Sequence, residues 1–243
     1  MYKPILTAAA IVVIACGCQY LYNSESYHET VVVITFDDAH KSIYTKAFPL
    51  MQKYGYPATN YVPVNRLDIE DHLTVGELHI LEDEGGWETG GHTVHHVNLP
   101  QVKIEEAEKE IAGCFDFLVE NSLQHCTFAL PSGHANEEII GIIKKYFSSI
   151  RGSEDFKMTC PADCYSLGYY DARNTDGSEK IIARILRGIT NHECVVIIGF
   201  HYIYADKSLH SRAVTPQEFN EVLEFINERN LKVKTVSQML EEW

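Results

Sequence analysis

The sequence is short of positive charge. Its 243 residues include 20 lysines and arginines against 34 aspartates and glutamates, and the basic residues form no continuous run. A protein that binds nucleic acid or another polyanion normally presents a patch of lysine and arginine, because contacts to phosphates supply most of its affinity. The net charge of −14 therefore argues against nucleic acid as a partner and favours a neutral substrate.

An apolar run near the start is too short to cross a bilayer comfortably. It is "ILTAAAIVVIA", residues 5–15, and after Lys3 it is typical of a secretory signal. It ends at "ACGC", which resembles a bacterial lipobox with Cys16 or Cys18 as the lipidated residue; a plain cleaved signal or a short membrane anchor is the alternative. We expect a signal at 1–17, a linker at 18–29 and an exported domain at 30–243, secreted or held at the cell envelope by a lipid anchor.

Cysteine is sparse after the expected signal. Apart from Cys16 and Cys18 of the lipobox-like segment there are five, namely Cys114, Cys126, Cys160, Cys164 and Cys194. In an oxidising compartment Cys160 and Cys164 could pair, because both lie in the loop-like segment "TCPADCYS". An odd count leaves at least one thiol free, and burial as a small apolar side chain is expected for the others.

Internal repeats and low-complexity tracts are also absent, and apolar strands alternate with amphipathic helices. Strands are expected within 31–36, 58–64, 87–96, 126–133, 148–152, 194–202 and 231–236, and helices within 42–55, 74–86, 103–122, 136–147, 178–190 and 215–230. The strands are continuously apolar, as in a parallel sheet covered on both faces. Together with 45% hydrophobic residues this predicts one α/β domain: a (β/α) barrel first, an open doubly wound sheet second.

Polar residues follow the expected strands at the same end. They are Asp37 and Asp38, His92 and His96, Pro131 with Ser132, Arg151, and His201. The carboxyl ends of parallel strands gather at one face of such a fold, and that face carries the chemistry. We therefore expect these side chains to share a site.

Two adjacent carboxylates repel each other unless a cation neutralises them, which favours a metal. His92 and His96 are four residues apart and would face the same way on a helical turn. One carboxylate with two histidines is typical of a catalytic zinc site with open positions, and Co²⁺, Ni²⁺, Mn²⁺ or Fe²⁺ would also fit. Each motif alone has an ordinary explanation, a chance histidine pair or a helix cap, so the prediction rests on their coincidence.

These residues resemble the motifs of the polysaccharide deacetylases with NodB homology, carbohydrate esterase family four. "TFDDA" resembles the first motif, and His92-Thr93-Val94-His95-His96 with Leu99 resembles the second. The resemblance implies a distorted (β/α) barrel of seven or eight parallel strands, and removal of acetyl groups from N- or O-acetylated sugars. It implies that Asp37 is the general base, that Asp38, His92 and His96 bind the metal, and that His201 is the acid.

Other positions depart from the family pattern. The arginine expected in the third motif is Ala129, although Pro131 and Gly133 keep the turn and the backbone N–H of Ser132 could face an oxyanion. We hypothesise that Arg151 reaches the base instead; a salt bridge to Glu154 or Asp155 is the alternative.

Two further departures concern the first and fourth motifs. The first-motif glycine is Ala39, which we expect to exclude a left-handed turn. The fourth motif is echoed only by Asp155-Phe156.

The leading hypothesis is an exported, metal-dependent deacetylase of acetylated glycans. In the mechanism that the resemblance implies, Asp37 takes a proton from a metal-bound water and His201 protonates the leaving group. A catalytically weak glycan-binding lipoprotein is one alternative. Hydrolysis of a small cyclic or linear amide by the same centre is another.

Overall fold

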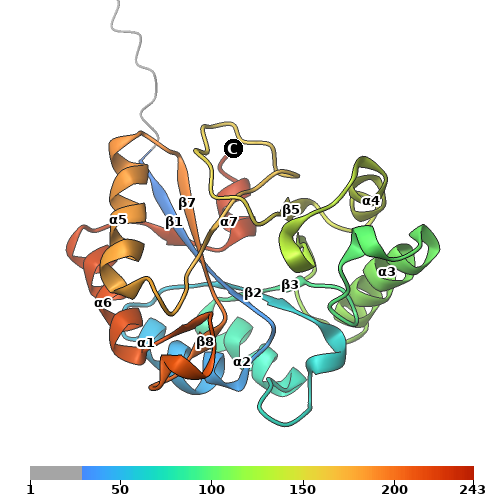
Figure 1. Cartoon of the computed structure of the whole chain (residues 1–243), viewed down its shortest axis with the longest axis horizontal. Helices are drawn as coiled ribbons and strands as arrows, with labels where there is room; N and C mark the ends of the chain where they lie inside the picture. Colours follow the sequence, from blue (N-terminus) through green and yellow to red (C-terminus); the bar gives the residue numbers. More distant parts are fainter. Residues whose placement is uncertain (1–28) are drawn as a thin grey trace, which may run out of the picture.

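The computed structural model describes residues 29–243, so the expected signal and nearly all of the linker lie outside the described residues. Figure 1 shows strands at the centre of the molecule and helices around its outside, with α5 and α6 on one side and α3 and α4 on the other. Within residues 29–243 no helix is both long and apolar enough to cross a membrane.

The central sheet has eight strands, and all of its strand pairs are parallel. In spatial order they are β5 (Ser149–Arg151), β4 (Thr127–Ala129), β3 (Glu88–Gly91), β2 (Thr59–Val62), β1 (Val31–Asp37), β7 (Val195–Phe200) and β6 (Tyr170–Asp171), with β10 (Val233–Lys234) paired to β1. Every residue of β1 and β7 is buried, as expected for strands covered on both faces.

Most of the helices connect these strands and cover the sheet from outside, whereas the last helix lies at the amino ends of the strands. The helices are α1 (Phe48–Gln52), α2 (Val75–Gly85), α3 (Ile104–Glu120), α4 (Glu137–Ile143), α5 (Gly177–Thr190), α6 (Pro216–Glu228) and α7 (Val236–Leu240). The Thr74–Glu77 capping box is present at the start of α2, where Thr74 accepts from the Glu77 N–H and the Glu77 side chain accepts from the Thr74 N–H. The helix expected over 42–55 begins as a π-helix, Ile43–Ala47, and continues as α1.

The barrel is distorted because its end strands do not close on each other. Within the described residues β5 and β6 are the two ends of the strand path. Residues 164–167 lie along β5 instead: the Ile150 N–H donates to the Cys164 carbonyl at 2.8 Å, and the Leu167 N–H donates to the Ile150 carbonyl at 3.0 Å. The predicted distorted (β/α) barrel is confirmed.

The hydrophobic core has two parts, one on each side of the sheet. The larger lies between the strands and the outer helices and includes Trp87, whose ring stacks on Phe36 at 5.1 Å. The smaller lies inside the barrel and includes Val236 and Met239 of α7. Because the Val236 N–H donates to Thr59 at the start of β2, α7 covers the amino ends of the strands. The carboxyl ends of the strands are not covered by α7, and the candidate functional site lies there.

The disulfide differs from the one expected. Cys160 bonds to Cys194, not to Cys164, and joins the irregular segment 152–169 to the residue that precedes β7. Cys160 and Cys164 are neighbours in sequence only, whereas the fold brings the start of β7 against this segment: the Cys194 N–H donates to the Met158 carbonyl at 3.1 Å. Of the other thiols Cys114 is buried as expected, Cys164 is partly exposed and Cys126 is exposed.

Candidate functional site

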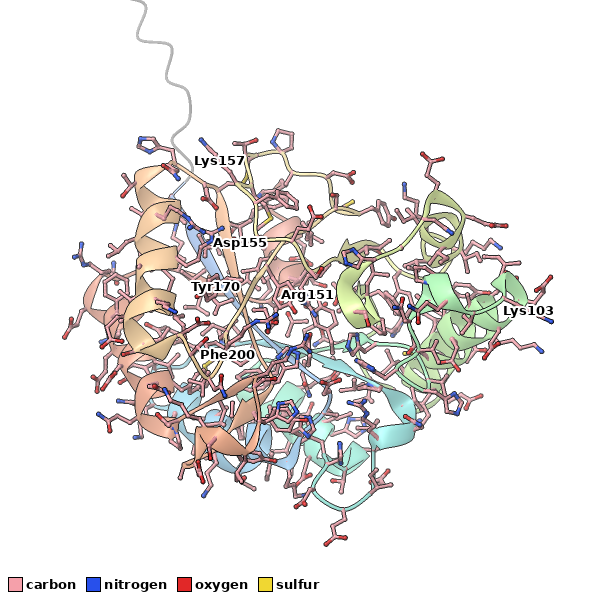
Figure 2. All side chains as sticks on the ribbon, viewed as in Figure 1. Lys103, Arg151, Asp155, Lys157, Tyr170 and Phe200 are labelled. Carbon is pink, nitrogen blue, oxygen red and sulfur yellow. A yellow bond between two sulfur atoms is a disulfide. The ribbon has the colours of Figure 1, made fainter. Side chains whose placement is uncertain are left out.

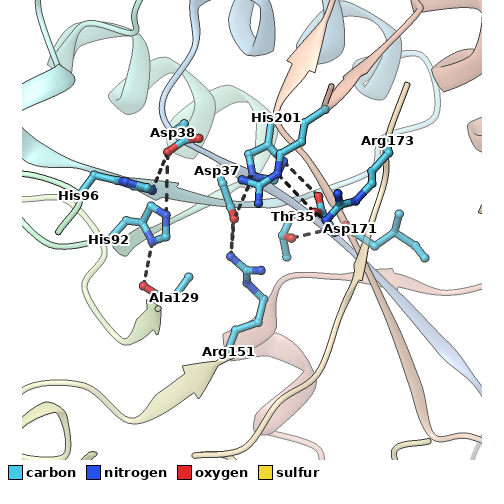
Figure 3. Close-up of polar contacts among 12 residues, drawn as sticks. Thr35, Asp37, Asp38, His92, His96, Ala129, Arg151, Asp171, Arg173 and His201 are labelled. Carbon is cyan, nitrogen blue, oxygen red and sulfur yellow. Dashed lines mark hydrogen bonds and ion pairs between the residues drawn. The ribbon is translucent and has the colours of Figure 1, made fainter. Parts of the chain in front are cut away.

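The predicted site residues meet at the carboxyl ends of the strands. Asp37 and Arg151 end β1 and β5, and His92 and His201 directly follow β3 and β7. Asp37, His92 and His201 line a cavity of about 230 Å³, and Arg151 contacts Asp37. The residues lining it are Asp37, His92, His96, Leu130, Ser132, Gly133, Ser153, Tyr169, Asp171, Arg173, His201 and Arg212. Figure 3 shows the polar side chains of this site converging from several strands.

Asp38, His92 and His96 have the geometry of a metal site. Their ligand atoms all lie within 4.8 Å of one another. Oδ1 of Asp38 is 3.1 Å from Nε2 of His96 and 4.0 Å from Nε2 of His92. Two ligands of one tetrahedral zinc ion stand about 3.3 Å apart, so a small shift of His92 would complete the set. The residues therefore fit a divalent ion.

The orientation and charge of His92 also suit a ligand. Its Nδ1 lies 2.8 Å from the Ala129 carbonyl and donates to it, which leaves the lone pair of Nε2 facing Asp38. Burial lowers the pKa of His92 to about 4 and also lowers the pKa of His96. Both imidazoles are thus neutral at neutral pH, the form that binds a metal.

The two histidines do not share a helical turn, so that expectation is wrong. Residues 92–96 form an irregular bend in which Thr93 and His96 have φ of 65° and 55°. Glu110 of α3 holds this bend, because its carboxylate accepts the His95 N–H at 2.8 Å and contacts His95 Nδ1 at 2.6 Å. The spacing identified the pair, but a tertiary contact to α3 supports its geometry.

Asp37 stands beside this cluster and is held by Arg151. Nη2 of Arg151 donates to both carboxylate oxygens of Asp37, at 2.8 and 2.6 Å, and both side chains are buried. Burial alone would raise the pKa of Asp37, but the charges of Arg151 and His201 outweigh it and lower the pKa. Asp37 is therefore an ionised carboxylate that can accept a proton.

Arg151 takes the place of the arginine that the third motif lacks. Ala129 and Arg151 are direct partners in the β4–β5 register, so the guanidinium comes from the neighbouring strand at the same level. It lies 3.8 Å from the centre of the Tyr169 ring and 4.9 Å from that of Tyr61. Figure 2 shows Arg151 near the middle of the molecule, whereas Lys103 lies at its edge. The alternative of a rim salt bridge is wrong: Asp155 pairs with Arg184 and Arg187.

His201 faces Asp37 and a third carboxylate, Asp171. Nε2 of His201 is 3.6 Å from Asp37 Oδ2, and Nδ1 is 3.6 Å from Asp171 Oδ1. Burial lowers the pKa of His201, while the charges of Asp37 and Asp171 act in the opposite direction. Asp171, not the expected Asp155-Phe156, is the acid beside His201.

The turn after β4 forms another wall of the cavity. Pro131 is buried, Ser132 is exposed with φ of 61°, and Gly133 has φ of 77°. Ser132 lines the cavity, as required of a residue whose N–H is to face an oxyanion.

The expectation for Ala39 is wrong. Asp38 and Ala39 have φ of 73° and 56°, so the chain turns left-handed here without a glycine. Such backbone costs about 1–2 kcal/mol for each L-residue. Ala39 is fully buried in the larger core, and that packing holds the turn in place.

Sequence reasoning missed three arginines and Asp171. Arg66 donates to Asp38 Oδ1 at 2.7 Å. Arg173 donates to Asp171 Oδ2 at 3.0 Å, and Nε of Arg212 lies 3.3 Å from the same oxygen. Asp171 ends β6, a strand of two residues, so no periodic pattern marks it.

The chain is similar in sequence to known proteins. YxkH of Bacillus subtilis is 28% identical over 120 residues, 48% of this chain and 42% of that protein. The poly-beta-1,6-N-acetyl-D-glucosamine N-deacetylase of Staphylococcus aureus is 29% identical over 185 residues, 68% of this chain and 63% of that protein. The match thus spans less than two thirds of each relative's length.

A solved structure and a family profile complete the comparison. A family 4 acetyl xylan esterase from Clostridium thermocellum superposes with a TM-score of 0.64 at 16% identity, over 87% of this chain and 91% of that one, and so shares the fold. The family profile described as "Polysaccharide deacetylase" matches residues 24–147, more than half of the chain. The chain belongs to the polysaccharide deacetylase family.

Proposed function

We propose that this protein is an exported, metal-dependent hydrolase that removes acetyl groups from an acetylated carbohydrate. One observation carries the proposal: an ionised carboxylate, a histidine and a metal-type cluster line one cavity of about 230 Å³. Asp37 is held by Arg151 at 2.6 Å and lies 3.6 Å from His201, and its neighbour Asp38 belongs to the cluster. A protein that only binds sugar has no use for a proton acceptor beside a metal site.

Asp38, His92 and His96 would hold the ion, which we expect to be Zn²⁺, with Co²⁺, Ni²⁺, Mn²⁺ or Fe²⁺ as alternatives. When bound, a divalent ion supplies a Lewis acid that polarises the acetyl carbonyl and activates water. Ala129 orients His92 through its carbonyl, and Glu110 holds the bend through His95.

Asp37 and His201 would divide the proton transfers between them. Asp37 accepts the proton of the attacking water, because Arg151 keeps its carboxylate ionised and fixed in orientation. His201 gives a proton to the departing amine or alkoxide and is positioned by Asp171 at its other nitrogen. The N–H of Ser132 would stabilise the oxyanion, with buried Pro131 fixing the turn.

The first substrate to test is an N-acetylated glucosamine polymer. The Staphylococcus aureus relative is named for poly-beta-1,6-N-acetyl-D-glucosamine, and its match covers 68% of this chain. Such polymers lie outside the cytoplasm, which agrees with the expected export and with a lipoprotein or secreted location.

The test is acetate release from N-acetylglucosamine oligomers by the protein loaded with Zn²⁺. We expect activity that a chelator abolishes and that added Zn²⁺ restores. Asp37→Asn should lower kcat by about 100-fold or more while the bound metal stays the same, because only the proton acceptor is lost. Asp116→Asn, at an exposed site on α3, is the matched control and should leave both unchanged. An unchanged rate in Asp37→Asn would refute the assignment.

A further inference from the structure

The site holds more guanidiniums than carboxylates, although acids outnumber bases 34 to 20 along the chain. The cavity is lined by Arg173, Arg212, Asp37 and Asp171. Outside this lining, Arg151 pairs with Asp37 and Arg66 with Asp38, so four guanidiniums contact three carboxylates. A bound divalent metal would add further positive charge. The charge of the site thus differs from that of the whole chain, and it is suited to a group with negative charge.

Two of the arginines stand on the open side of the site. Arg173 and Arg212 line the cavity, and their side chains are 55% and 35% exposed. Both contact the same atom, Oδ2 of Asp171, at 3.0 and 3.3 Å. Figure 3 shows Arg173 beside Asp171, close to His201. One carboxylate thus balances two guanidiniums, and one positive charge is left over.

The two guanidiniums keep donors for a ligand. A guanidinium has five N–H donors in a planar fork that matches a carboxylate. The contacts to Asp171 and His201 engage Nη2 of Arg173 and Nε and Nη1 of Arg212. The other N–H groups of each guanidinium are exposed and can bind an anion without breaking a buried ion pair.

Arg212 also contacts His201, the proposed acid. Its Nη1 lies 3.1 Å from Nε2 of His201 and donates to it. In that state Nε2 carries no proton for a leaving group. A ligand anion that engages Arg212 would draw the guanidinium away from Nε2 and free this nitrogen to take up a proton from solvent, which it can then give to the leaving group. Anion binding and protonation of the acid would therefore be coupled.

We propose that Arg173 and Arg212 form a subsite for a carboxylate on the acetylated sugar, so that the preferred substrate is an acidic glycan. This inference rests on the proposed deacetylase function and specifies its substrate class. The carboxylate would lie beside the cleaved acetyl group, on the leaving-group side marked by His201. A carboxylate is favoured over a phosphate because the single positive charge left over by Asp171 matches one negative charge, whereas a phosphate monoester carries about −1.5 to −2 at neutral pH.

The test compares matched oligosaccharides. An N-acetylglucosamine tetramer, the same tetramer with its primary alcohols oxidised to carboxylates, and a 6-phosphorylated tetramer are assayed for acetate release and titrated calorimetrically. We expect kcat/KM for the carboxylated tetramer to exceed that for the neutral one by about tenfold or more, and the preference to shrink as salt rises. Arg173→Gln should bring the ratio close to one. Arg212→Gln should lower the ratio through kcat as well as KM.

Arg229→Gln, at an exposed arginine that packs on Phe225 of α6, is the matched control and should keep the wild-type ratio. Equal kcat/KM and equal binding for the neutral and carboxylated tetramers would overturn the subsite and leave the deacetylase function standing. A preference for the phosphorylated tetramer would overturn the assignment to carboxylate. If no tetramer releases acetate, the deacetylase function fails, and the calorimetric ratio still decides whether the subsite binds carboxylate.

Discussion

At the scale of single residues, the site shows how the place of one side chain can be filled from a neighbouring strand. The family pattern places an arginine where this chain has Ala129, yet the parallel register sets Arg151 directly beside that position. Gly199 of β7 is constrained by the same group of side chains. A Cβ there would stand 2.3 Å from the Tyr169 ring, which in turn lies against the Arg151 guanidinium. These positions compensate for one another: Arg151 lies beside Ala129, and Gly199 leaves room for the Tyr169 ring that lies against the guanidinium.

This arrangement predicts a strong effect of Arg151→Ala. Without the guanidinium the pKa of Asp37 should rise, because burial is then opposed chiefly by His201. The acidic limb of the kcat/KM profile should move to higher pH, and kcat should fall by about 100-fold with the metal content unchanged. The double variant Ala129→Arg/Arg151→Ala should regain at least about tenfold of the loss.

The measurements are the pH dependence of acetate release, bound zinc and circular dichroism. Folding must be checked because removing one partner of a buried ion pair costs about 3–5 kcal/mol. Arg229→Ala serves as the surface control. Normal activity in Arg151→Ala would end the hypothesis that this arginine orients the base.

At the residue scale, the sequence indicated which side chains would lie close together where local chemistry was distinctive. The residues that it placed at this end of the strands each end or follow a recognisable apolar strand, and they are Asp37, Asp38, His92, His96, His201 and Arg151. Asp171 escaped because β6 has two residues and is defined only by pairing with Ile198 and Gly199 of β7. Arg212 escaped because it lies in the connection between β8 (Tyr202–Ile203) and β9 (Ala213–Val214), far from any motif.

At the scale of elements, α7 depends on a buried carboxylate. Glu88, at the start of β3, is fully buried. Its carboxylate accepts hydrogen bonds from the hydroxyls of Thr59 and Thr127 at 3.0 Å and from the Ser237 N–H at 3.1 Å. These donors join three strands to α7. The sequence did not reveal α7, because five residues after a short strand carry too little periodicity to predict a helix.

Replacing Glu88 tests how far this contact holds α7. Glu88→Ala would leave buried hydroxyl and amide donors without an acceptor and should lower the free energy of unfolding by about 3 kcal/mol. Glu88→Gln keeps the shape and an acceptor oxygen and should lose less. Chemical denaturation measures both, with Glu120→Gln at the exposed end of α3 as control.

The direction of the Glu88 pKa shift predicts how the stability of wild type, relative to Glu88→Gln, changes with pH. Burial raises the pKa of Glu88, although hydrogen bonds from Ser237, Thr127 and Thr59 oppose it. A raised folded-state pKa adds stability that is full below the unfolded value and is lost as pH rises through the folded value. Wild type should therefore lose stability relative to Glu88→Gln as the pH rises above 4.5, the ordinary pKa of a glutamate side chain. A difference independent of pH would show that Glu88 does not change its charge in this range.

At the scale of the whole molecule, the fold was predictable and its closure was not. This sequence alone indicates a parallel α/β barrel, because continuously apolar strands alternate along it with amphipathic helices. Whether the last strands close the barrel depends on how residues 152–169 pack. The hydrophobic residues of that segment follow no regular spacing, so its structure could not be predicted. The Cys160–Cys194 bond illustrates the limit, because the two cysteines meet only after β7 is placed. The pairing expected from sequence proximity was wrong for this reason.

The proposed metal site predicts that a bound ion stabilises the whole molecule. Asp38 comes from the end of β1 and the two histidines from the bend after β3, so an ion would bind the folded chain and not the unfolded one. Zn²⁺ at 100 times its Kd should add about 2.7 kcal/mol, which corresponds to a rise in Tm of about 5–10 °C for a domain of this size. Differential scanning calorimetry with chelator and with Zn²⁺ measures the shift.

His92→Ala separates binding at this site from adventitious binding. Loss of one of three ligands should remove most of the Zn²⁺-dependent rise in Tm, whatever the variant's own Tm in chelator. His79→Ala, on α2 and outside the cluster, should keep the full rise. If wild type and His92→Ala gain the same Tm from Zn²⁺, the ion binds elsewhere, and the carboxylate and histidines at the carboxyl ends of β1 and β3 are not its ligands.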